Sequence, residues 1–71
     1  MNQHRYDIRV EGQLSADWSD WFDGLKVCQM PNGETVLSGR LDQAALHGVL
    51  DKVRDLGLVL VAVSSDEKGE L

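Results

Sequence analysis

Residues 41–63 read LDQAALHGVLDKVRDLGLVLVAV, a helix signal followed at once by a strand signal. Asp42 is a natural N-cap, because its carboxylate can accept hydrogen bonds from the free backbone N–H groups of a first helical turn. Gly57 stands where a residue of positive φ commonly ends a helix, in the Schellman motif. Between these two positions the apolar residues recur at helical spacing, at Leu46, Val49, Leu50, Val53 and Leu56. The stretch therefore predicts a helix that begins after Asp42 and ends before Gly57.

The run from Leu58 to Val63 is apolar without interruption, which is typical of a buried strand. Alternation places Val59, Val61 and Val63 on one face of this strand, and apolar residues also occupy the other face. An edge strand with two apolar faces normally has a cover. We expect a second copy of the chain to supply that cover, with the three valines as the dimer edge.

The rest of the chain predicts three more strands. Strict alternation of apolar and polar residues indicates a strand over 6–11 with one buried face. Residues 25–30 and 35–41 are expected to pair as a hairpin around the turn Pro31-Asn32-Gly33-Glu34, because proline suits its second position and Asn and Gly tolerate positive φ.

A second helix is expected between Ser15, as its start, and Gly24, as its end. Trp18, Trp21 and Phe22 stand at i, i+3 and i+4, which is one face of an α-helix. We expect this face to pack into the core. The alternative is an apolar ligand pocket lined by the two tryptophans.

The order strand, helix, strand, strand, helix, strand predicts an α+β domain with the ferredoxin-like βαββαβ split. Its four-stranded antiparallel sheet would carry two helices on one face. The first strand would lie between the third and the fourth, and the fourth would lie at the edge. We expect a single domain over 1–71, with an ordered core over about 6–63 and a loose acidic tail over 64–71.

Charge and size narrow the range of partners. The 71 residues carry a net charge of −5, with scattered lysines and arginines, so we expect no nucleic-acid partner.

One cysteine excludes an internal disulfide and fits a reducing compartment. No signal-peptide pattern is present, and the longest apolar run is far shorter than the roughly 20 residues of a membrane span. We therefore expect a cytoplasmic protein without a membrane partner, and its small size favours a homodimer.

Few residues of the sequence suggest a catalytic or metal-binding role. His47 lies one helical turn before Asp51, a spacing at which a carboxylate can orient an imidazole as a general base, although a solvent-exposed pair is the simpler interpretation. Cys28 has no histidine or second cysteine nearby in sequence that could activate it as a nucleophile. We therefore expect Cys28 to be a small residue that packs on a sheet face. Neither residue fits zinc-ligand spacing, and we expect no metal and no cofactor. The candidate binding residues are Trp18, Trp21, His47 and Cys28.

Three motifs together resemble a family of short, uncharacterised bacterial proteins. They are W-x-x-WF-x-GL over 18–25, DQAALHG over 42–48 and RDLGL over 54–58. The resemblance extends from Tyr6 to Val63. It implies a small α+β domain and implies no activity or catalytic residue.

Three functional hypotheses remain open. The first is a small cytoplasmic homodimeric binding or adaptor module without catalytic activity, which has a possible further protein partner. The second is a small-molecule sensor, similar to ACT domains, with a pocket at the subunit interface. The third is a small enzyme of the dimeric ferredoxin-like barrel type that uses His47 or Cys28.

Overall fold

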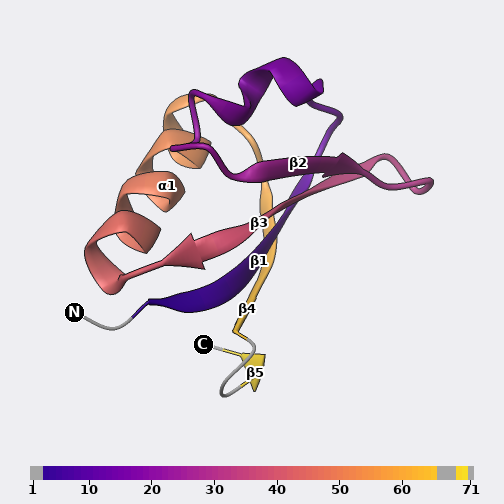
Figure 1. The fold of residues 1–71 in the computed structure, drawn as a ribbon. Coiled ribbons are helices and arrows are strands. Elements are labelled where there is room, and N and C mark those ends of the chain that lie inside the picture. Colours follow the sequence, from indigo (N-terminus) through magenta and orange to yellow (C-terminus); the bar gives the residue numbers. More distant parts are fainter. Residues whose placement is uncertain (1–2, 66–68, 71) are drawn as a thin grey trace.

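The computed structural model describes residues 3–65 and 69–70, and it places one α-helix on one face of an antiparallel sheet (Figure 1). The elements are, in chain order, β1 (His4–Glu11), the 3-10 helix η1 (Ala16–Ser19), β2 (Lys26–Gln29), β3 (Glu34–Leu41), α1 (Gln43–Asp55), β4 (Leu60–Ser65) and β5 (Gly69–Glu70).

The strands lie in the order β2-β3-β1-β4-β5, and every neighbouring pair is antiparallel. β1 therefore lies between β3 and β4, as predicted. β1 and β3 pair over their whole length, from His4 opposite Leu41 to Glu11 opposite Glu34. Because β3 and β4 flank β1 on opposite sides, α1 must cross the sheet between them, and it covers one face.

The core lies between α1 and that face. Alternation in β1 is confirmed: Tyr6, Ile8 and Val10 are buried, while the polar residues between them are exposed. The predicted hairpin turn is also confirmed. Gly33 has a φ of +89°, and the side-chain oxygen of Asn32 accepts a hydrogen bond from the backbone N–H of Glu34 at 3.0 Å.

Both predicted ends of α1 are confirmed. The Asp42 carboxylate accepts a hydrogen bond from the Ala45 N–H at 2.8 Å. At the other end, Gly57 has a φ of +75° and donates to the carbonyl of Arg54 at 2.9 Å. The N–H of Leu58 donates to the carbonyl of Val53 at 3.1 Å, which completes a Schellman motif. On the apolar stripe Leu46, Val49 and Val53 are buried, and Leu50 and Leu56 are half-buried.

The prediction of a ferredoxin-like fold with two helices is wrong, because α1 is the one α-helix among the described residues. The segment expected to form the other helix contains only the four-residue η1, followed by turns up to Gly24. Ser15 makes no side-chain capping hydrogen bond. Asp23 and Gly24 have positive φ values of 60° and 81°, which an α-helix does not accommodate. The fold is α+β, with a 3-10 turn in place of the first helix.

Polar contacts to the neighbouring strands hold the chain before η1 in an irregular course. Thr35 is fully buried, and its hydroxyl donates to the Gly12 carbonyl at 2.7 Å and accepts from the Leu14 N–H at 3.1 Å. The Gln29 side chain donates to the Leu14 carbonyl at 2.8 Å. These contacts seat Leu14 in the core and satisfy backbone groups that lie outside any strand or helix.

β4 differs from its prediction, because it begins at Leu60 and contains a bulge. Arg9 pairs with Ala62 but Val10 pairs with Leu60, so Val61 is an extra residue in the ladder. The bulge breaks the expected alternation. Val61 and Val63 were predicted to share one face of the strand, but Val63 packs against the core and Val61 is exposed.

The predicted loose tail is wrong in its first part. Ser64 and Ser65 belong to β4, and they pair with the short strand β5. The other residues of the predicted tail, 66–68 and 71, lie outside the described residues.

Candidate functional site

The four predicted binding residues do not form one site. Trp18 and Trp21 lie on and just after η1, His47 is exposed on α1, and Cys28 is exposed on β2. Asp51 forms an ion pair with Arg54 at 3.6 Å, and no hydrogen bond joins it to His47. Across residues 3–65 and 69–70, no group of three or more His, Cys, Asp or Glu side chains is arranged to hold a metal ion. The molecule presents three separate surfaces as candidate sites.

The first surface is formed by Trp18 and Trp21, which are 36% and 44% exposed. Their rings meet edge to face with centroids 6.4 Å apart. Only Phe22, which is fully buried, joins the core, so the predicted core role of the tryptophans is wrong. The reason is that the 3-10 helix ends at Ser19, so Trp21 and Phe22 lie in the turns after it and the i, i+3, i+4 face of an α-helix does not form.

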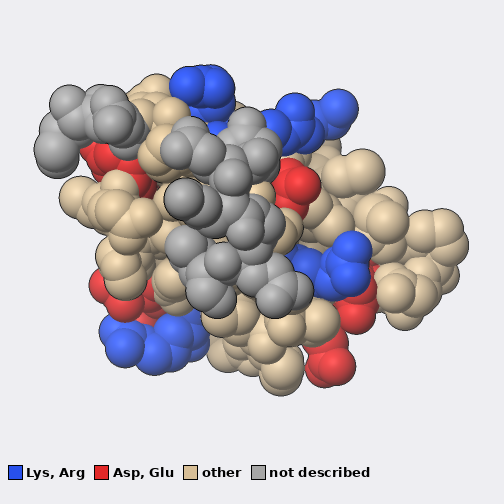
Figure 2. Space-filling view, turned by 90° about the horizontal axis from the view of Figure 1, so that it is seen from below, with Lys and Arg blue, Asp and Glu red and all other residues tan. Residues whose placement is uncertain are grey.

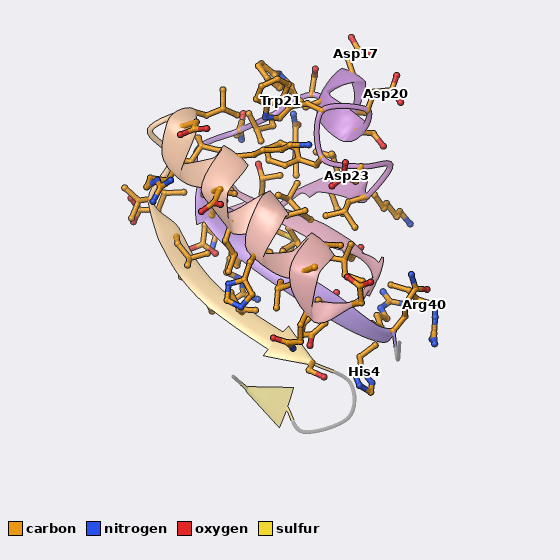
Figure 3. The ribbon with its side chains drawn as sticks, turned by 90° about the vertical axis from the view of Figure 1, so that its left-hand side faces the viewer. His4, Asp17, Asp20, Trp21, Asp23 and Arg40 are labelled. Carbon is orange, nitrogen blue, oxygen red and sulfur yellow. The ribbon has the colours of Figure 1, made fainter. Side chains whose placement is uncertain are left out.

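Lys52 of α1 contacts the segment that follows η1. Its ammonium nitrogen lies 5.6 Å from the ring centroid of Trp21, donates to the Trp21 carbonyl at 2.9 Å and lies 3.3 Å from a carboxylate oxygen of Asp23. Asp17 and Asp20 point away from the body of the molecule beside Trp21 (Figure 3). The lysine thus holds one ring of the pair in place by a cation–π contact.

The second surface is the apolar edge, which we define as Val59, Leu60 and Val61. These consecutive residues are 57%, 45% and 43% exposed. On its outer side β4 pairs with β5 only at Ser64 and Ser65, within the part of the chain that is described. Edge strands usually carry charges or proline that discourage association, and the apolar edge has neither.

The third surface is the open face, the side of the sheet opposite α1. It contains a depression of about 490 Å³ whose walls come from β1, β2, β3 and β4. Among the described residues, Arg5, Arg9 and Lys26 line it together with one carboxylate, Asp7, and the exposed thiol of Cys28. The helix-free face thus presents a concave and mainly cationic surface at its centre.

Charge is mixed on the face that Figure 2 shows. Seen from below, groups of Lys and Arg alternate with groups of Asp and Glu (Figure 2).

In the described part of the chain, no helix is both long enough and apolar enough to span a bilayer.

Comparison with known proteins identifies one family. A family model with the description "Domain of unknown function (DUF8691)" matches residues 5–64. The matched segment includes most of β1 and reaches into β4, so it contains all three surfaces. No curated protein and no solved structure matches the chain. The expected membership of an uncharacterised family is confirmed.

Proposed function

We propose that this chain, which belongs to the DUF8691 family, is a binding or adaptor domain without catalytic activity that works as a homodimer. The observation that carries the proposal is the apolar edge. Exposed apolar surface costs about 25 cal/mol per Å², and association removes that surface from water. Consecutive large apolar residues on an uncovered strand are typical of a contact surface between proteins.

A second copy of the chain is the occupant that best fits the apolar edge. With a net charge of −5, two copies repel each other, so an uncharged strand offers the contact with the least repulsion. Among the described residues, β5 pairs with β4 only at Ser64 and Ser65, so Leu60 and Val61 of the apolar edge lie in the part of β4 that β5 does not pair. Around a two-fold axis the same strand serves both copies, so one surface suffices for the whole interface.

Sedimentation equilibrium of the full chain at micromolar concentration tests this proposal. We expect a mass of about twice the chain mass of 7.9 kDa for the unmodified protein. Val61→Lys should give the monomer mass, because an ammonium group would have to be desolvated in the interface. Ala44→Lys places the same change at an exposed position on α1 and should remain dimeric.

Circular dichroism of each variant shows whether the fold is retained. A monomeric unmodified protein, or a folded Val61→Lys variant that still dimerises, would contradict the proposal.

A small-molecule sensor is a second candidate, favoured by the depression on the open face. Ala62 and Ser64 of β4 line the depression, so a ligand bound there would lie beside the proposed interface. Ligand binding would then be coupled to association of the two copies. A thermal-shift screen of metabolites tests this candidate: a hit should raise the melting temperature and tighten the dimer.

The bacterial and cytoplasmic origin of the chain is also proposed. Cys28, its one cysteine, is exposed, which suits a compartment that keeps thiols reduced. We further propose the motifs over 18–25, 42–48 and 54–58 as the family signature, because they include the Phe22 anchor, the Asp42 cap and the Gly57 cap. Other family members should retain these residues together.

A further inference from the structure

We propose that the open face binds a small molecule through a phosphate group, at a site formed by Arg5, Lys26 and Arg40. The fold gathers four of the seven lysines and arginines of an acidic chain on this face, the fourth being Arg9. Arg5 and Arg9 share β1, whereas Lys26 and Arg40 are distant in sequence and reach this face through the pairing of β1, β2 and β3.

Arg5 and Arg40 are directly opposite each other in the β1–β3 ladder. Directly opposed residues point to the same face with Cβ atoms about 4.5–5.5 Å apart, and like charges in that position destabilise the sheet. Their present partners offset this only weakly: Arg40 donates to the Gln3 carbonyl at 3.1 Å, and the Arg5 Nε lies 3.8 Å from an Asp7 oxygen. An anion between the two guanidinium groups would turn the repulsion into attraction.

Lys26 provides a third positive charge from the next strand. It pairs with Ser38, which lies two residues before Arg40 on β3, so the lysine and Arg40 are diagonal neighbours at about 7–8 Å. Within the described residues Lys26 forms no ion pair. Ser38 thus has Lys26 directly opposite it on β2, while on β1 Asp7 is directly opposite and Arg5 is the diagonal neighbour. Charged donors together with a hydroxyl are what phosphate oxygens accept from.

Arg5, Lys26 and Ser38 line the depression, whereas Arg40 is not among its lining residues and lies beside Arg5 in the ladder. The size and lining of the depression indicate a small ligand. Its volume of about 490 Å³ lies in the range of small-molecule pockets, about 300–1,000 Å³. Val36 and Ala62 provide apolar surface for the rest of the ligand. None of the described residues that line the depression is aromatic, so this part of the chain offers no stacking platform for single-stranded nucleic acid there.

An NMR titration of the full-length protein with inorganic pyrophosphate tests the site. We expect saturable amide shifts confined to β1, β2 and β3, around Ser38. Arg5→Gln and Lys26→Gln should each weaken binding about tenfold, equivalent to about 1.4 kcal/mol. Both side chains are exposed, so these variants are expected to fold. Asp7→Asn should strengthen binding, because it removes the carboxylate that competes for Arg5.

Arg54→Gln is the matched control, since it removes one positive charge from the exposed side of α1, away from the open face. Equal weakening by Arg54→Gln would show a general charge effect and overturn the site. An absence of saturable shifts would also overturn it. Tighter binding of a single-stranded oligonucleotide than of pyrophosphate and a nucleoside monophosphate would contradict the small-molecule assignment. The oligomeric state is measured separately, so failure here leaves the dimer proposal standing.

Discussion

At the scale of single residues, Thr35 holds the segment before η1 through two hydrogen bonds. Its buried hydroxyl serves both the Gly12 carbonyl and the Leu14 N–H. Thr35→Val keeps the shape but leaves both groups without a partner, so we expect a loss of about 1–3 kcal/mol in the free energy of unfolding. Urea denaturation measures this loss, and Thr35→Ser, which retains the hydroxyl, serves as the control. A valine variant as stable as the serine variant would show that water replaces the hydroxyl.

At the scale of elements, the segment around η1 depends on one anchor. Phe22 is fully buried, whereas Trp21 is 44% exposed and is held by Lys52 at its surface. We therefore expect Phe22→Ala to cost about 3–5 kcal/mol and Trp21→Ala clearly less. Thermal melts followed by circular dichroism compare the two variants. A larger loss for Trp21→Ala would restore the tryptophan to the core and remove it as a candidate contact residue.

At the scale of the whole molecule, net charge and the apolar edge act in opposite directions on the dimer. Two copies that each carry −5 repel each other, and salt screens that repulsion over a Debye length of about 10 Å at 0.1 M. A contact through Val59, Leu60 and Val61 contains no ion pair for salt to weaken. We therefore expect the dissociation constant to fall as NaCl is raised, measured by sedimentation. A rise with salt would indicate an interface of ion pairs elsewhere on the surface.

The sequence by itself determined the features whose causes are local. Asp42 and Gly57 bound α1 through hydrogen bonds to residues within a few positions, and alternation in β1 follows from the geometry of a strand. The order of the first four strands was also predictable, because short connections allow few arrangements. The pairing of β5 with β4, which was expected to lie at the edge, was not predicted. The W-x-x-WF spacing was misleading, since it fits one face of an α-helix but occurs in a tighter turn.

Only the tertiary structure decided the features that depend on pairing between distant segments. The hydroxyl of Thr35 and the side chain of Gln29 hold the chain before η1 from other strands, and no local signal reports such contacts. The bulge at Val61 depends on the register of β4 with β1. In that register Leu60 is exposed, although alternation along the sequence placed it on the face opposite the three valines of the predicted dimer edge. Arg5 faces Arg40 for the same reason. Both proposed surfaces thus follow from the register of β1 with β3 and β4, which joins segments that are distant in sequence. A slip of one residue in that register would move every side chain of a strand to the other face.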